Sequence, residues 1–280
     1  CMILLDYNGI AISNIMAQRL GENEDMIRHM ILNTIRMYKH KFRGHGDIVI
    51  VTDAGGNWRK DVFPEYKANR KKTRDASSVD WERLFEITNM VFDEITENFP
   101  YRTMRVWGTE ADDCIAQICI GTQEFGAYED IMIVSADKDF AQLQKYKNVK
   151  QYSPMTKKFI TEEDPRGFLL EHILKGDTSD GVPNVLSDDK VFVEGRRQGV
   201  MSAKKKATLT EDINAMGEEV VRNFQRNERM IDLTKCPDKL VIDIKEHFNK
   251  QAPHANKGKV FPYLVNKQCR RLLEVVEEFF

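Results

Sequence analysis

Aspartates follow three apolar segments of this sequence, and their positions indicate metal chemistry. The run IMIV at residues 131–134 leads into Asp137 and Asp139, whereas MILL leads into Asp6 and IVIVT into Asp53. Unbroken apolar runs of this length are typical of strands buried on both faces of a parallel sheet. Such strands deliver their last residues to the carboxyl edge, where open α/β folds bind ligands. We therefore expect these four aspartates to meet at one edge.

Two further acidic segments add carboxylates to this set. Residues 108–116 read GTEADDCIA and contain Glu110, Asp112 and Asp113, while residues 173–185 contain Asp177 and Asp180. A purely structural interpretation exists for the first segment, because Thr109 suits an N-cap and acids in a first helical turn are favoured by the helix dipole. Three acids in four positions exceed what a cap needs, which favours metal ligands.

Gathered at one edge without counter-charge, these carboxylates would repel one another and several would bind protons. Oxygen ligands without His or Cys select hard cations, so Mg²⁺ is the expected ion and Mn²⁺ its substitute. So many acids exceed the needs of one ion, and two ions clamp the attacking and leaving oxygens of a phosphodiester. The expected ligands are Asp6, Asp53, Glu110, Asp112, Asp113, Asp137, Asp139, Asp177 and Asp180.

Basic residues cluster directly after Asp53 and again near residue 200. Between residues 58 and 74, Lys and Arg are mixed with aromatic residues, a composition suited to a sugar-phosphate backbone with stacked bases. The alternative is a solvated loop. Lys67 and Arg70 are the candidates for stabilising a phosphodiester transition state. The expected nucleic-acid contacts are Arg59, Lys60, Tyr66, Lys71, Lys72, Lys204, Lys205 and Lys206.

The composition describes a globular protein of a reducing compartment. The chain has 280 residues, of which 41% are hydrophobic and 31% charged, with a net charge of −2. Five scattered cysteines without C-x-x-C spacing argue against a disulfide framework or a zinc site, and the six histidines form no recognisable ligand motif. No apolar run is long enough for a signal sequence or a membrane span. We expect a cytoplasmic monomer.

The apolar patterns predict an α/β fold with a mostly parallel central sheet flanked by helices. Two domains are expected, one at residues 1–162 that carries the acidic edge of the sheet, and a helical one at residues 163–280. A short strand is expected at 105–107 and a hairpin at 149–161. The expected helices span residues 10–20, 24–43, 81–98, 211–230, 238–248 and 260–280.

Several motifs, in this order, resemble the 5′-nuclease superfamily of flap endonucleases and polymerase exonuclease domains, and most of all the ribonucleases H of T-even bacteriophages. They are LLDYNG, TDA, YKANRKK, EADDCIA, SADKDFAQL and ILKGDTSDGVPNV, and they cover most of residues 1–185. The resemblance implies a metal-dependent nuclease that removes RNA primers and 5′ flaps. It also implies a basic helical arch at about residues 55–80, with Lys67 and Arg70 as its catalytic basic residues, and it places Asp113, Asp177 and Asp180 at outer or second-site positions.

The resemblance also implies a helix-hairpin-helix-like element that holds duplex DNA. Residues 186–198 depart from that pattern as a longer, charged insertion, so the detail of duplex binding is open here. The helices past Glu211 resemble only the phage proteins, in which this region is implicated in contact with a single-stranded-DNA-binding protein. That protein and a sliding clamp are the expected partners. The alternative functions are a non-catalytic DNA junction-binding module and a small-molecule phosphohydrolase. The full acidic set argues against the first and the two basic regions against the second.

Overall fold

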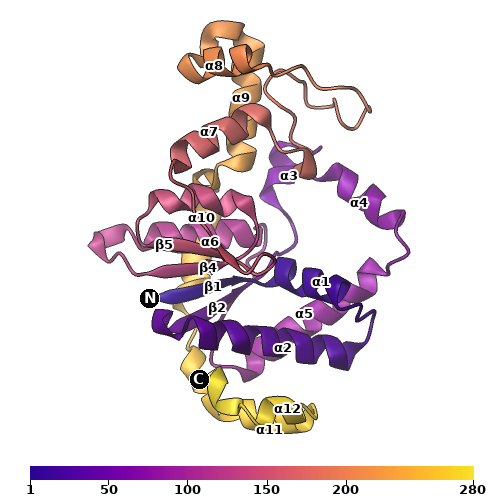
Figure 1. Ribbon diagram of the computed structural model, residues 1–280, viewed down its shortest axis with the longest axis vertical. Helices are drawn as coiled ribbons and strands as arrows, with labels where there is room; N and C mark the ends of the chain where they lie inside the picture. Colours follow the sequence, from indigo (N-terminus) through magenta and orange to yellow (C-terminus); the bar gives the residue numbers. More distant parts are fainter.

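A computed structural model describes all residues, 1–280, and is built around a six-stranded sheet (Figure 1). Its strand order is β3-β2-β1-β4-β5-β6, and every pairing is parallel except that of β6 with β5. The mostly parallel sheet predicted from the sequence is confirmed. The strands are β1 (Met2–Asp6), β2 (Asp47–Val51), β3 (Arg102–Met104), β4 (Ile131–Val134), β5 (Val149–Ser153) and β6 (Lys158–Ile160).

The central strands are apolar at nearly every position because helices cover both faces of the sheet. In β1, Ile3 and Leu5 enter one core cluster, whereas Leu4 enters another on the opposite face. The first face is covered by α1 (Tyr7–Ala17), α2 (Glu24–Lys41) and α5 (Trp81–Asn98), and the second by α6 (Ala111–Gly121) and α10 (Asp238–Asn249). Because β1 pairs in parallel with β2 and with β4, the carboxyl ends of these three strands lie at the same edge of the sheet.

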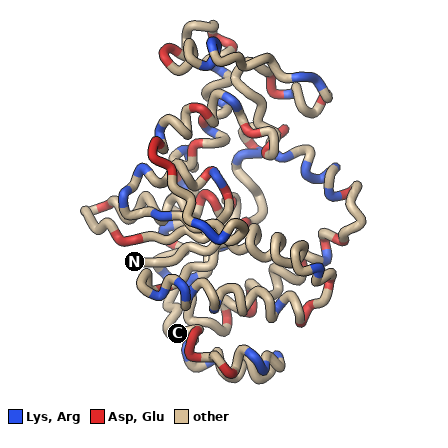
Figure 2. The backbone as a smooth tube through the Cα atoms, viewed as in Figure 1, with Lys and Arg blue, Asp and Glu red and all other residues tan.

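The segment between β2 and α5 forms the arch. It contains α3 (Trp58–Val62) and α4 (Ala68–Asp75), and Figure 1 shows α4 standing away from the sheet above α1. The residues of α4 are all exposed, and Lys and Arg follow its length in Figure 2. The predicted basic helical arch is therefore present.

The C-terminal part divides between two places. One lobe contains α7 (Pro165–Lys175), α8 (Ala203–Glu211) and α9 (Glu218–Ile231), at the top of Figure 1. The chain then returns through α10 to α11 (Val260–Asn266) and α12 (Arg270–Leu273), whose apolar residues share a core with α2 and α5. The last helices of the chain therefore pack on the sheet domain, and the boundary at residue 163 stays a prediction. No helix combines the length and apolar character needed to cross a membrane.

Short 3-10 segments connect these elements. They are η1 (Arg43–His45), η2 (Glu124–Gly126), η3 (Lys138–Lys145), η4 (Thr178–Asp180), η5 (Ile213–Met216), η6 (Leu233–Lys235), η7 (Pro253–Lys259) and η8 (Val276–Phe279).

Three sequence-based boundaries were wrong. The short strand lies at Arg102–Met104, since the Met104 carbonyl makes the last bond to Thr52 and the chain then turns at Val106. The helix predicted for 211–230 is interrupted between Asp212 and Gly217, where η5 intervenes. The helix predicted for 260–280 breaks at Gln268, whose φ of 55° is incompatible with a right-handed helix.

Candidate metal and phosphodiester site

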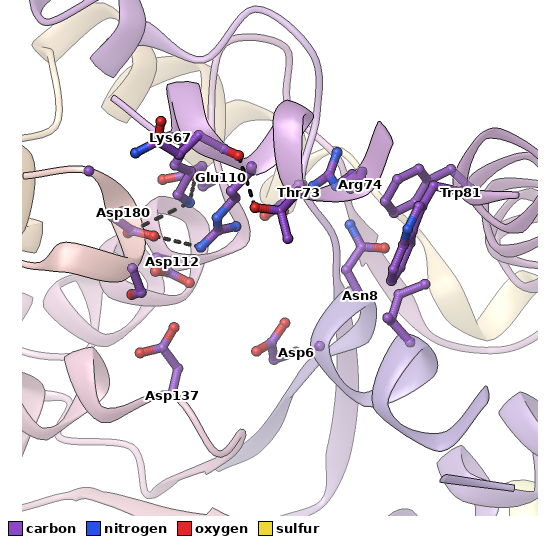
Figure 3. A pocket seen from close by; sticks show the side chains of 18 of the residues that line it. Asp6, Asn8, Lys67, Thr73, Arg74, Trp81, Glu110, Asp112, Asp137 and Asp180 are labelled. Carbon is purple, nitrogen blue, oxygen red and sulfur yellow. Dashed lines mark hydrogen bonds and ion pairs between the residues drawn. The ribbon is translucent and has the colours of Figure 1, made fainter. Parts of the chain in front are cut away.

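A cleft of about 770 Å³ lies at the carboxyl edge of the sheet, beneath the arch (Figure 3). Six predicted ligands line it: Asp6, Asp53, Glu110, Asp112, Asp137 and Asp180. Lys67 and Arg70 line the same cleft from the arch. Carboxylates from segments far apart in the sequence thus converge at one edge of the sheet, as the strand pattern predicted. Two basic side chains lie with them.

Asp6 ends β1 and points into the cleft. Its Oδ2 accepts a hydrogen bond of 2.7 Å from the Ser135 hydroxyl. A Cβ on Gly9 would lie 3.0 Å from this oxygen, so glycine leaves the carboxylate room beneath the first turn of α1. Burial, opposed by the Ser135 hydrogen bond and reinforced by Asp53 and Asp137, raises the pKa of Asp6 from 3.8 to about 7. The ionised form of Asp6 therefore lacks a counter-charge.

The N-terminus of α6 places Glu110 and Asp112 opposite Asp6. Asp53 joins them because its Oδ1 accepts the Ala111 backbone N–H at 2.7 Å. Burial together with Glu110 raises the pKa of Asp53, and burial together with Asp137 raises that of Asp112. The helix dipole favours these charges but does not neutralise them.

Asp137 and Asp139 sit where β4 passes into η3. The Asp137 carboxylate caps η3 by accepting the Asp139 N–H at 2.9 Å. Oxygens of Asp112, Asp137 and Asp139 lie within 4.8 Å of one another, close enough to share one cation. Burial and the Asp137 charge raise the pKa of Asp139 to about 7. A divalent ion would relieve this repulsion.

The arch cations are paired with cleft acids. Lys67 contacts Glu110, and Arg70 donates to Asp180 at 2.5 Å. Although burial opposes it, Lys67 together with Arg59 lowers the pKa of Glu110. Lys67 has a left-handed φ of 55°, and its N–H donates to the Asp180 carbonyl at 2.8 Å. Non-glycine residues in this region are uncommon and cluster at functional sites.

Asp113 does not face the cleft, and the structure corrects that prediction. Its carboxylate is 0% exposed, accepts two hydrogen bonds from Arg59 at 2.8 and 2.9 Å, and also caps the Glu110 N–H. The capping box of α6 thus uses Glu110 and Asp113, not Thr109 and Asp112. Arg59 is 1% exposed, so the predicted contact of Arg59 with nucleic acid is corrected as well.

The aromatic residues of the basic segment are core residues. Trp58, Phe63 and Tyr66 pack with Ile173 and Met230 of the C-terminal lobe. The Tyr66 hydroxyl is buried and donates to Glu110 at 2.9 Å. Base stacking by Tyr66, which the sequence suggested, is therefore blocked by its burial.

His172 is a site residue that sequence reasoning missed. It lies in the last turn of α7, between Asp139 and Asp177, with ring nitrogens 3.3 and 3.0 Å from their oxygens. Asp177 is buried, and its Oδ1 accepts from Ser179 and Asp180 backbone N–H groups. Although burial opposes it, the His172 and Ser179 hydrogen bonds lower the pKa of Asp177. Asp177 is thus an outer residue of the site, not one that lines the cleft.

Comparison with known proteins agrees with this arrangement. Residues 2–168 match the 5′-3′ exonuclease N-terminal resolvase-like domain, and residues 167–279 match the C-terminal domain of T4 RNase H. The chain belongs to the 5′-3′ exonuclease family.

Individual relatives of this 5′ nuclease are phage and bacterial enzymes. It is 34% identical to ribonuclease H of enterobacteria phage T4, across 99% of this chain and 95% of that protein. It is 31% identical to a 5′-3′ exonuclease of Buchnera aphidicola, across 59% of this chain and 56% of that protein. The resemblance recognised in the sequence is confirmed.

Solved structures share the fold. A phage T5 flap endonuclease complexed with DNA and metal ions has a TM-score of 0.64, 17% identity and coverage of 89% of this chain and 99% of that one. T5 5′-exonuclease with bound zinc has a TM-score of 0.65, 17% identity, and coverage of 90% and 99% respectively.

The remaining predicted contacts of this 5′ nuclease are accessible. Lys60, Lys71 and Lys72 are exposed on α3 and α4, and Lys204 and Lys205 are exposed on α8. Lys206 is partly buried and pairs with Glu171 at 3.3 Å. In place of a hairpin, residues 184–199 form a loop closed by hydrogen bonds of Asn184 with Gln198 and Gly199.

The raised pKa values make a prediction for the metal-free nuclease. Because the folded protein binds protons at Asp6 and Asp139 more tightly than the unfolded chain does, the contribution of these two groups to folding stability falls between about pH 4 and pH 7. Asp6→Asn removes one of these charges. We expect it to raise the unfolding free energy by about 1–2 kcal/mol at pH 8, in chelator, and to change it little at pH 5.

Chemical denaturation at the two pH values measures this difference. Asp47→Asn, at an exposed residue on the opposite edge of the sheet, is the control and should show no such pH dependence. A destabilised Asp6→Asn variant at pH 8 would contradict the electrostatic account of the cleft.

Proposed function

We propose that this protein hydrolyses phosphodiester bonds of DNA, and of RNA in RNA–DNA duplexes, near 5′ ends and flaps, using two divalent ions. Mg²⁺ is the proposed ion and Mn²⁺ its substitute. The observation that carries the proposal is the convergence of Asp6, Asp53, Asp112 and Asp137 in one cleft with two basic residues above it. The phage T5 flap endonuclease, which has this fold, is described in complex with DNA and metal ions.

The cleft residues fit such ions. The donors are oxygens, which suit Mg²⁺ and Mn²⁺. Asp139 Oδ1 is buried without a hydrogen-bond partner, and burial together with neighbouring acids raises the pKa of Asp6 and Asp112. One of the two ions would be held by Asp6, Asp53, Glu110, Asp112 and Asp137. The other ion would be held by Asp139 and Asp180. When bound, two ions activate water and stabilise the leaving oxygen of an in-line displacement.

The arch residues have a separate role in this proposal. Lys67 and Arg70 now neutralise Glu110 and Asp180. With Glu110 and Asp180 engaged elsewhere, the Lys67 and Arg70 side chains would be free to contact the substrate phosphate and to stabilise charge that develops on it. The exposed Lys71, Lys72, Lys204 and Lys205 are proposed to attract the strand backbone.

Lys67→Ala tests the role of the arch cation. We expect the cleavage rate to fall about a hundredfold with little loss of substrate affinity, because one transition-state contact is removed while the outer basic residues stay. Single-turnover cleavage of a 5′-labelled flap and equilibrium binding in Ca²⁺ measure the two quantities.

Lys60→Ala is the matched control, since Lys60 is exposed on α3 and lies outside the cleft. Equal losses in both variants would mean that Lys67 supplies only general attraction for nucleic acid.

Cleavage products separate the candidate functions. Magnesium-dependent release of short 5′ products supports the nuclease proposal, and tight binding without cleavage supports a junction-binding module. Activity confined to mononucleotides supports a phosphohydrolase. A single-stranded-DNA-binding protein and a sliding clamp as partners, a monomeric state and a cytoplasmic location stay predictions from the sequence.

A further inference from the structure

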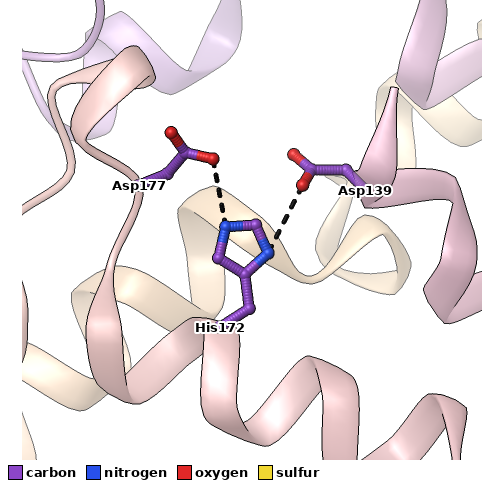
Figure 4. A group of neighbouring side chains, drawn as sticks. All are labelled: Asp139, His172 and Asp177. Atoms are coloured by element: carbon purple, nitrogen blue, oxygen red, sulfur yellow. Dashed lines mark hydrogen bonds and ion pairs between the residues drawn. The ribbon is translucent and has the colours of Figure 1, made fainter. Parts of the chain in front are cut away.

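His172 occupies an unusual place for an imidazole beside an acidic cleft (Figure 4). It lies on the last turn of α7, with 8% of its surface exposed. Its ring packs edge-on against the ring of Phe168, with the two ring centroids 5.9 Å apart. The chain turns back after α7 at Gly176, where φ is 71° and a Cβ would lie 2.4 Å from the Val182 carbonyl. This turn brings Asp177 to one side of the ring, while η3 brings Asp139 to the other.

The hydrogen bond to Asp177 selects the tautomer of a neutral imidazole. Nε2 lies 3.0 Å from Asp177 Oδ2, and an ionised carboxylate can only accept, so Nε2 carries the hydrogen. In a neutral imidazole the other nitrogen, Nδ1, then presents a lone pair. Lys138 Nζ lies 3.3 Å from the same Asp177 oxygen, and its positive charge favours the ionised form of that carboxylate.

The second nitrogen faces a second lone pair. Nδ1 lies 3.3 Å from Asp139 Oδ1, and both atoms are buried without a hydrogen-bond partner. Two buried acceptors facing each other cost free energy unless a proton or a metal ion lies between them. Two ligands about 2.1 Å from one ion lie roughly 3.0 to 3.4 Å apart at angles of about 90° to 109°. The observed separation therefore suits two ligands of a single ion.

We propose that His172 Nδ1, together with Asp139, is a ligand of one of the divalent ions, and that this nitrogen makes the position prefer a transition metal such as Mn²⁺ over Mg²⁺. The inference rests on the proposed function and names the metal class of one of its two positions. Metal-binding histidines commonly donate their other ring N–H to a carboxylate, which orients the ring, and Asp177 is that carboxylate here. Imidazole nitrogen suits transition metals, whereas Mg²⁺ takes oxygen ligands.

His172→Gln is the informative substitution. A glutamine amide can keep a donor toward Asp177 while it presents oxygen, not nitrogen, toward Asp139. We expect the ratio of Mn²⁺ to Mg²⁺ affinity at one of the two positions to fall about tenfold, the low end of the effect of altering such a shell. Isothermal titration calorimetry on the full chain, without a histidine tag, measures both affinities. His254→Gln, at an exposed histidine on η7, is the control and should leave the ratio unchanged.

Pulsed electron paramagnetic resonance of bound Mn²⁺ tests the ligand without relying on a variant. We expect nitrogen coupling in the wild-type chain, a changed coupling after labelling its histidines with nitrogen-15, and no coupling in His172→Gln. Two bound Mn²⁺ ions without nitrogen coupling would overturn the proposal and leave the nuclease proposal intact. An unchanged affinity ratio in a folded His172→Gln variant would also overturn it. Absence of any divalent-ion binding would instead overturn the proposed function itself.

Discussion

We expect Asp137→Asn to lower the single-turnover rate of flap cleavage at least about a thousandfold, while substrate affinity changes less than about threefold. Oxygens of Asp137, Asp112 and Asp139 lie within 4.8 Å of one another, so a neutral amide at residue 137 weakens the binding of the ions that the chemistry needs. Substrate affinity should change little, because the exposed basic residues of α4 and α8, which are proposed to attract the nucleic-acid backbone, keep their charges. Rapid-quench kinetics in Mg²⁺ and fluorescence anisotropy in Ca²⁺ measure the two effects.

Asp61→Asn provides the control for loss of a negative charge near the arch. Asp61 is exposed on α3 and does not line the cleft, so its variant should cleave at the wild-type rate. Wild-type cleavage by Asp137→Asn would remove this aspartate from the proposed machinery.

A second large effect concerns stability. We expect Asp113→Ala to lower the unfolding free energy by about 3–5 kcal/mol, because it leaves the Arg59 guanidinium buried without its principal partner. The same substitution removes the acceptor for the Glu110 N–H at the start of α6. Urea unfolding in chelator, followed by circular dichroism, measures the loss without a contribution from bound ions.

The neighbouring residue supplies the matched control. Asp112→Ala removes an acid that faces the cleft and whose pKa is raised by burial and by Asp137, so in chelator it should preserve or increase stability. Equal destabilisation by both variants would contradict the assignment of Asp112 as a metal ligand and of Asp113 as a structural partner of Arg59.

The contrast between these neighbours explains what sequence could and could not predict. The convergence of Asp6, Asp53 and Asp137 could be predicted, because each follows an apolar strand and parallel strands end at the same edge of a sheet. Successive helical residues point about 100° apart, so Asp112 faces the cleft while Asp113 faces the core. Composition alone cannot distinguish these directions. The position of the buried partner Arg59 decides them, and that position depends on how α3 packs against α9.

Other site features depended on tertiary packing. The basic segment was recognised by its charges, yet its aromatic residues fill the interface with the C-terminal lobe because apolar surface there would otherwise be exposed. His172 lies five residues before Asp177. The two side chains come close enough to lie beside one ion only because the chain turns back at Gly176. A histidine shortly before an acidic turn is the one signal in the sequence that could have suggested it.

Anomalous diffraction from crystals soaked in Mn²⁺ tests most directly whether the gathered carboxylates form a two-ion centre. Our account predicts two anomalous peaks in the cleft, one among Asp6, Asp112 and Asp137 and one beside Asp139. A map without a peak at these carboxylates, from crystals in which the cleft is open to solvent, would contradict it.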